Sequence, residues 1–225
     1  MRTTDGGLHA RDLELHTARG PVYAPTSLDI EPGSVTALLG PARSGRTALL
    51  LTLAGRMRPS GGTATVACHD IVRGARKVRG DVGLGLISGV NDLDDPLTAE
   101  QHLRERALMR GGLRGFDREA LLGRVGLKGL GGRPVSRLTT EQRMRLGIAL
   151  ALVGNPPIIA IDDLDHDVEL EQQAAIVGTL REIAASDTTV VFTCVDVRTA
   201  ALADAVVTLP AADQLHQEAR IHAVA

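Results

Sequence analysis

One eight-residue segment limits the fold of this chain more than any other: Gly40-Pro-Ala-Arg-Ser-Gly-Arg-Thr47. It has the form G-x-x-x-x-G-R-T and lies between an apolar run at residues 35–39 and an Ala- and Leu-rich stretch at residues 47–54. This order predicts a strand, a tight loop and a helix. In such a loop, glycines let successive backbone N–H groups turn toward one anion, and the positive end of the following helix faces the same anion. We therefore expect a loop that binds phosphate.

Every residue of this loop is a candidate for nucleotide contact: Gly40, Pro41, Ala42, Arg43, Ser44, Gly45, Arg46 and Thr47. The Thr47 hydroxyl is expected on Mg²⁺, as in P-loop sequences that end in Ser or Thr. The pattern has Lys where this chain has Arg46, and a broad guanidinium does not replace a compact ammonium between terminal phosphates. Two other interpretations stay open: the segment is a glycine-rich turn without a ligand, or Arg46 reflects a general preference for Arg, since only two of the 25 basic residues are Lys.

The rest of the chain alternates apolar runs with helical stretches. Strands are expected at residues 13–15, 28–30, 63–68, 158–161, 188–193 and 205–209. Helices are expected at residues 139–153 and 169–185, with several more between residues 98 and 130. Continuous apolar strands separated by helices indicate a mainly parallel sheet that is buried on both faces.

Composition argues against several classes of protein. A net charge of −2 argues against nucleic-acid binding by bulk positive charge, and only three aromatic residues, Tyr23, Phe116 and Phe192, weaken a model of base stacking. No early apolar stretch follows a basic start, so no secretory signal is expected. No window approaches about 18 uninterrupted apolar residues, so no membrane-spanning helix is expected. We therefore expect any link to a membrane to run through a partner.

Further segments follow the loop in a characteristic order. Leu138-Thr-Thr-Glu-Gln142 opens a helix, an Asn-Pro pair precedes the apolar run at residues 158–161, and Asp162-Asp163 ends that run. This order resembles the nucleotide-binding subunit of ATP-binding cassette (ABC) transporters over about residues 8–209. The resemblance implies that Asp162 holds Mg²⁺ through water. The alternative for the acidic pair is a solvated turn after a strand.

The resemblance also gives Asp163 a role. In the family, a Glu at this position orients or deprotonates the attacking water. Asp163 is shorter by one methylene, and a misplacement of that order can cost about 100-fold in rate. We therefore expect Asp163 to act as a weakened catalytic base.

The remaining functional positions of the family depart further. Residues 138–142 align with the L-S-G-G-Q signature, which clamps ATP held by the opposite subunit; Gln142 is kept, whereas Thr140 and Glu141 replace two glycines. Gln142 is therefore a candidate nucleotide contact. The alternative, which we favour over an intact clamp, is a helix start in which Thr139 and Gln142 form a capping box.

Three further positions lack the family residue. Ile87, Ser88 or Gly89 occupies the place of the Q-loop glutamine, depending on alignment. Cys194 stands at the switch histidine, where a buried structural cysteine is favoured over a reactive thiol. His16 is nearest to the aromatic residue that stacks on adenine, with an exposed loop histidine as the alternative.

An acidic segment, Asn91-Asp-Leu-Asp-Asp95, lies where the family docks a coupling helix of its membrane subunit. It is either a binding site for a basic coupling helix or a solvated run of charge.

We expect one ABC-type ATP-binding domain over residues 1–225. Its fold would be an α/β P-loop NTPase fold, with a mainly parallel sheet, antiparallel N-terminal strands and a helical insert at about residues 92–142. The resemblance implies ATP and Mg²⁺ as cofactors and slow hydrolysis by a cytoplasmic subunit of a membrane transport complex.

The expected partners are a transmembrane permease subunit and a second ABC subunit, identical or related, with no nucleic acid and no direct membrane insertion. The alternative function is a regulatory or scaffold module that binds nucleotide without hydrolysis. A soluble ABC protein is a third possibility, although those usually carry two cassettes or long insertions.

Overall fold

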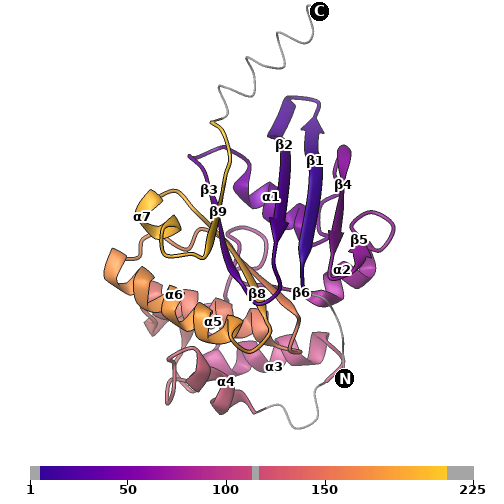
Figure 1. Ribbon diagram of the computed structural model, residues 1–225. Helices are drawn as coiled ribbons and strands as arrows, with labels where there is room; N and C mark the ends of the chain where they lie inside the picture. The colour runs from indigo at the N-terminus through magenta and orange to yellow at the C-terminus, as the bar shows by residue number, and fades with distance from the viewer. Residues whose placement is uncertain (1–5, 113–116, 212–225) are drawn as a thin grey trace, which may run out of the picture.

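The computed structural model describes residues 6–112 and 117–211 (Figure 1). Phe116 and the two ends of the expected domain lie outside these residues. The described strands form one four-stranded and one five-stranded sheet.

The N-terminal sheet is antiparallel. Its strands are β1 (Leu8–Thr17), β2 (Gly20–Ile30), β4 (Gly61–Val66) and β5 (His69–Asp70), in the order β2-β1-β4-β5. The sequence predicted only short strands around Leu13 and Leu28. Register shifts along β1, with Asp12 in the left-handed region at φ 46°, interrupt the alternation of apolar and polar residues. The alternating pattern is therefore much shorter than the strand itself.

The second sheet is entirely parallel and carries the expected phosphate loop. Its strands are β3 (Val35–Leu39), β6 (Val82–Leu84), β7 (Ile158–Ile161), β8 (Thr189–Cys194) and β9 (Ala205–Thr208), in the order β6-β7-β8-β3-β9. The prediction of a mainly parallel sheet with antiparallel N-terminal strands is confirmed. Strand β6 was not predicted, because it is short and contains Gly83, where any side chain would overlap the carbonyl oxygen of Ala151.

Helices cover the parallel sheet on both faces. They are α1 (Arg46–Leu53), α2 (Ala75–Asp81), α3 (Ala99–Met109), α4 (Arg118–Arg124), α5 (Thr140–Leu152), α6 (Leu170–Ala184) and α7 (Val197–Ala200), with a 3₁₀ turn at Val135–Arg137. Helices α3 and α4 fall within residues 92–142 and lie away from the antiparallel sheet, beyond α5 (Figure 1).

The core is divided by the parallel sheet into two apolar clusters. Ile159 and Ile161 of β7 join the cluster that includes α5 and α6, whereas Ile158 and Ala160 join the cluster that includes α1 and the antiparallel sheet. This alternation along one strand explains why β7 is apolar at every position. Across the described ranges, no helix has both the length and the apolar character needed to cross a bilayer.

Candidate nucleotide-binding site

The phosphate loop joins the carboxyl end of β3 to the start of α1, in the strand–loop–helix context that the sequence predicted. The Gly40 amide donates to the Cys194 carbonyl oxygen at 3.3 Å, which ties the loop to the end of β8. Gly45 has φ 84°, and a side chain there would overlap the Val22 carbonyl oxygen of β2. Glycine is therefore required at position 45 by both the backbone conformation and the close approach of β2.

The loop encloses a hollow of about 250 Å³, lined by Pro41, Arg43, Ser44, Gly45, Arg46, Thr47 and Ala48. The Ser44 hydroxyl oxygen is buried and has no hydrogen-bond partner among the described residues. A buried polar atom of this kind costs free energy unless a ligand or water satisfies it. The loop thus fits a phosphate, whose oxygen would accept a hydrogen bond from the Ser44 hydroxyl.

The two residues expected to hold the metal, Thr47 and Asp162, lie together beneath this loop. The Thr47 hydroxyl is 2.9 and 3.1 Å from the two carboxylate oxygens of Asp162, which follows β7. Hydroxyl and carboxylate oxygens are the hard donors that Mg²⁺ prefers. The chemistry of this pair fits Mg²⁺, and the two residues come from segments 115 positions apart.

The protonation of Asp162 is set by opposing effects. Burial raises its pKa most, and the negative charge of Asp163 raises it further. Hydrogen bonds from Thr193 and Thr47 and the charge of Arg46 lower the pKa of Asp162. On balance the pKa of Asp162 is raised, because burial outweighs the hydroxyl donors; a bound cation would favour the ionised carboxylate.

Arg46 crosses the loop and contacts the candidate catalytic base. One terminal nitrogen, Nη1, donates to the Gly40 carbonyl oxygen, and the other, Nη2, donates to Asp163 Oδ1 at 2.9 Å. The Arg46 side chain is 10% exposed and that of Asp163 is 46% exposed. Arg46 Nε is buried without a partner among the described residues. Arg46 of the loop and Asp163 after β7 therefore form an ion pair. An incoming phosphate would compete with Asp163 for the Arg46 guanidinium.

Sequence reasoning missed Thr193, which holds the acidic pair in place. Its hydroxyl donates to Asp162 Oδ1 at 2.7 Å and accepts from the Asp163 amide at 2.7 Å. Asp163 itself has φ 42°, a left-handed conformation that Asp tolerates better than most residues. The available signal was a hydroxyl residue near the carboxyl end of the apolar run of β8 (Thr189–Cys194).

Other residues that align with functional positions of the ABC family make local structural contacts. The Thr139 side chain accepts from the Gln142 amide and the Gln142 side chain accepts from the Thr139 amide, both at 3.2 Å, so the capping box is confirmed. Gln142 was expected to touch a nucleotide on another subunit, a contact that one chain does not contain.

Cys194 is fully buried, as favoured from the sequence. Burial raises the pKa of its thiol to about 12, with a smaller contribution from Asp165. His16 is exposed at the end of β1 and lies 3.1 Å from the Glu14 carboxylate.

The loop that replaces the Q-loop is held by Asn91. Its side-chain oxygen accepts from the Ile87 amide, and its side-chain nitrogen donates to the Gly85 carbonyl oxygen, both at 2.7 Å. Ile87 is buried. This segment therefore has an apolar and internally bonded centre where the family has a glutamine.

Residues 23–165 match the model of the family described as "ABC transporter". The chain is 30% identical over 169 residues to the daunorubicin resistance ATP-binding protein DrrA3 of Streptomyces coeruleorubidus, covering 74% of this chain and 53% of that protein. It is 27% identical over 173 residues to the zinc import ATP-binding protein ZnuC of Roseobacter denitrificans, covering 76% and 62%. The chain thus spans about half the length of the first of these relatives.

Solved structures share the fold. A nucleotide-free ATP-binding cassette from an ABC transporter matches with a TM-score of 0.78 at 17% identity, covering 90% of this chain and 87% of that one. A dimeric ATP-binding cassette bound to ADP and Pi matches with a TM-score of 0.75 at 20% identity, covering 90% and 94%. The family match extends over more than half of the sequence, and its limits take in the phosphate loop, the capping box and the acidic pair. The chain therefore belongs to the ABC transporter family.

Proposed function

We propose that this chain binds ATP with Mg²⁺ and hydrolyses it slowly as the cytoplasmic, membrane-peripheral subunit of a transport complex. The observation that carries the proposal is the contact between the Thr47 hydroxyl and the Asp162 carboxylate beneath the phosphate loop. In the same loop, Ser44 Oγ is buried without a hydrogen-bond partner among the described residues. A phosphate seated in the loop would accept from Ser44 and from backbone amides, with the positive end of α1 facing it.

The metal, when bound, would supply positive charge that neutralises the terminal phosphates. Thr47 and Asp162 are the residues that would hold it, and Thr193 keeps the Asp162 carboxylate oriented through its hydrogen bond. Asp163 is the candidate base for the attacking water. Its Oδ1 already accepts a hydrogen bond from Arg46 at 2.9 Å, so this oxygen is not free to face a water. This pairing and the short side chain both support slow turnover.

Family membership supports the proposed partners. Relatives are ATP-binding proteins of a resistance and an import system, which supports a transmembrane permease subunit and a second ABC subunit as partners. The acidic segment at residues 91–95 remains a candidate docking site for a basic helix. Two of its carboxylates have internal contacts: Asp92 accepts from the Gly89 amide at 3.0 Å, and Asp95 pairs with Arg143 at 2.7 Å.

A titration of the purified chain with ATP and Mg²⁺, followed by calorimetry, tests nucleotide binding. We expect weak binding that Thr47→Ala reduces about tenfold, because a hydrogen bond to a charged group contributes about 1.5–3 kcal/mol. Thr65→Ala, at an exposed position of β4, is the matched control and should bind like the wild type. No binding at millimolar nucleotide by folded protein would contradict the proposal.

A second function, nucleotide binding without hydrolysis in a regulatory or scaffold module, is favoured by one observation. Asp163, the candidate base after β7, is already paired with Arg46. Phosphate release measured with the membrane partner distinguishes the two functions. A rate equal to that of Asp163→Asn would favour the non-hydrolysing module.

A further inference from the structure

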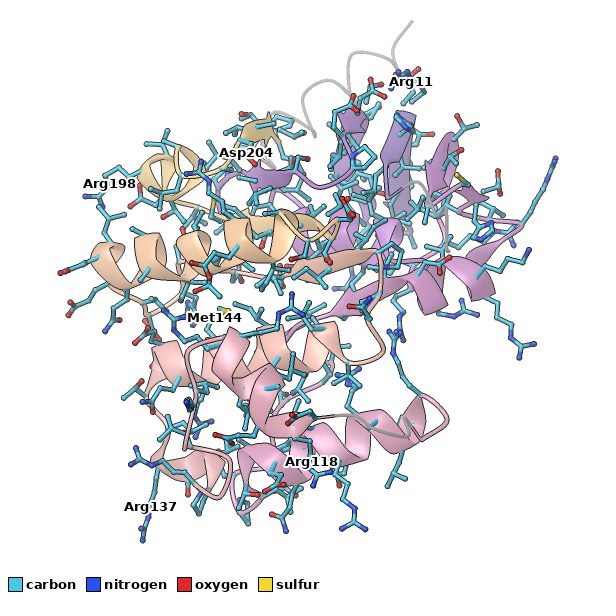
Figure 2. All side chains as sticks on the ribbon, turned by 60° about the horizontal axis from the view of Figure 1, so that its bottom comes forward. Arg11, Arg118, Arg137, Met144, Arg198 and Asp204 are labelled. Carbon is cyan, nitrogen blue, oxygen red and sulfur yellow. The ribbon has the colours of Figure 1, made fainter. Side chains whose placement is uncertain are left out.

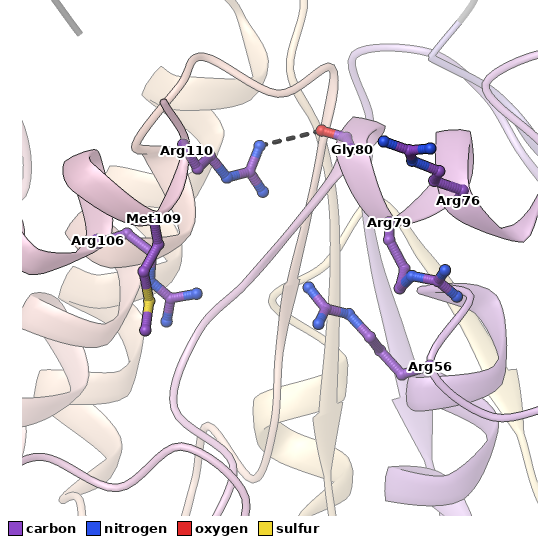
Figure 3. A pocket seen from close by; sticks show the side chains of 7 residues that line it. All are labelled: Arg56, Arg76, Arg79, Gly80, Arg106, Met109 and Arg110. Atoms are coloured by element: carbon purple, nitrogen blue, oxygen red, sulfur yellow. Dashed lines mark hydrogen bonds between the residues drawn. The ribbon is translucent and has the colours of Figure 1, made fainter. Parts of the chain in front are cut away.

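A second hollow, of about 490 Å³, lies between α2 and α3 and shares no lining residue with the phosphate loop (Figure 3). Five of the seven residues that line it are arginines: Arg56, Arg76, Arg79, Arg106 and Arg110. We call it the arginine pocket. Its volume is in the range of small-molecule sites in proteins, about 300–1,000 Å³.

The arginines of the pocket are not paired directly with carboxylates in the described part of the chain. Within residues 6–112 and 117–211, none of the ion pairs involves any of the five arginines. Asp81 ends α2 close by. Its negative charge raises the pKa of Arg110, against the larger effect of burial, but its carboxylate lies 3.5 Å from the ring of His69 and forms no ion pair with the pocket. One nearby carboxylate thus faces five arginines, and a ligand could neutralise the rest of the charge.

The crowding of these cations has an electrostatic effect. Burial lowers the pKa of Arg106, and the charges of Arg110 and Arg56 lower it further. Burial also lowers the pKa of Arg56, with additional contributions from Arg79 and Arg110. Like charges held this close repel one another, so a bound anion would relieve an unfavourable interaction as well as form new ones.

The pocket is also partly preorganised. Arg79 donates to the Gly55 carbonyl oxygen and Arg110 to the Gly80 carbonyl oxygen, each at 3.0 Å. Arg106 and Arg110 extend from the α3 side, and Arg56 reaches toward them from the opposite side (Figure 3). Backbone carbonyls thus fix the guanidinium groups of Arg79 and Arg110. The guanidinium groups of Arg56 and Arg106 have no hydrogen-bond acceptor in the described part of the chain.

We propose that the arginine pocket binds an anion that carries two or more phosphate groups. A carboxylate presents two oxygens in one plane and suits a single guanidinium. A phosphate presents oxygens in several directions and can accept from arginines on facing walls. Several adjacent phosphates also supply, in a compact ligand, the multiple negative charges that five arginines require. The ligand is either soluble or the headgroup of a lipid.

Calorimetry with inorganic pyrophosphate as the probe tests this site. The pocket variant Arg56→Gln/Arg106→Gln should bind pyrophosphate at least about tenfold more weakly than the wild type, since two charged hydrogen-bond donors are lost. The matched control, Arg124→Gln/Arg137→Gln, removes the same charge from exposed positions elsewhere and should bind like the wild type. The Arg137 side chain points away from the rest of the protein (Figure 2). Binding at the phosphate loop is common to all three proteins and is fitted as a separate site, so that the variants are compared at the arginine pocket alone.

Equal weakening in both double variants, or no weakening in the pocket variant, would overturn the proposal. Tighter binding of a polyglutamate peptide than of pyrophosphate through the same arginines would also overturn it in favour of an acidic protein segment. Circular dichroism and thermal melting check that the variants fold, and the single variant Arg76→Gln, at an exposed position, provides a milder second test with a smaller loss in the same direction.

Sedimentation with vesicles identifies the source of the phosphate. Cosedimentation with vesicles that contain cardiolipin, whose headgroup carries two phosphates, but not with phosphatidylcholine vesicles, would support a lipid headgroup if it depends on Arg56 and Arg106. Pyrophosphate binding without such cosedimentation would support a soluble ligand. Both results are consistent with the proposed phosphate chemistry.

Discussion

The ion pair between Arg46 and Asp163 leads to a prediction in which binding and turnover change in opposite directions. Asp163→Asn removes the negative charge that holds the Arg46 guanidinium at 2.9 Å. Asn tolerates the left-handed conformation of this position, φ 42°, so the backbone should not change. The guanidinium would then be available to a terminal phosphate.

The size of the effect follows from the exposure of the pair. Arg46 is nearly buried, but Asp163 is half exposed, so the pair belongs at the upper end of the exposed class, about 1 kcal/mol. Since 1.4 kcal/mol corresponds to tenfold in affinity, ATP should bind about fivefold more tightly to Asp163→Asn. ADP lacks the terminal phosphate and should gain less. Turnover should fall to background, because the amide is not a base.

Calorimetry with ATP and ADP, and phosphate release with the membrane partner, measure these effects. Asp167→Asn is a close control, since Asp167 is also left-handed, at φ 53°, and its side chain is 78% exposed. It should change neither affinity nor rate. Unchanged or weaker ATP binding by Asp163→Asn would show that Asp163 does not withhold Arg46 from the phosphate.

Three further predictions concern residues of the same site. Arg46→Lys should raise the affinity for ATP relative to ADP, because a compact ammonium reaches between terminal phosphates; titrations that show equal or lower affinity would mean that Arg46 is adapted to its site. Thr193→Val should lower the free energy of unfolding in urea by about 1–3 kcal/mol, since Asp162 and the Asp163 amide each lose a partner. In alkylation at pH 8, native protein should react at one of its two cysteines, the exposed Cys68, because the raised pKa of Cys194, about 12, keeps that buried thiol neutral. Two equivalents before denaturation would refute this.

Local chemistry made much of the fold predictable from the sequence. Gly45 of the phosphate loop is required locally by its left-handed backbone, so the loop is visible as a spacing. The capping box at Thr139 and Gln142 is likewise a contact across three positions. Strand β1 is the contrary case, since its register shifts remove the alternation on which strand prediction depends.

The parts of the site that sequence reasoning missed are contacts between distant segments. Thr193 reaches Asp162 across 31 positions, and Arg46 reaches Asp163 across 117. The arginine pocket gathers residues from three separate stretches in a chain where arginine is frequent everywhere. No local pattern distinguishes these arginines, because only the packing of α2 against its neighbours brings them to one hollow.

The position of β3 in the parallel sheet affects how the site responds to heat. Strand β3 is bonded to β8 on one side and β9 on the other, and the phosphate loop begins where β3 ends. Segments paired on both sides and covered on both faces open only when the whole domain unfolds, so their amides exchange with deuterium last. The loop is thus anchored to a strand that is paired on both sides. On warming, the capacity to hold phosphate should therefore be lost together with the fold, and not before it.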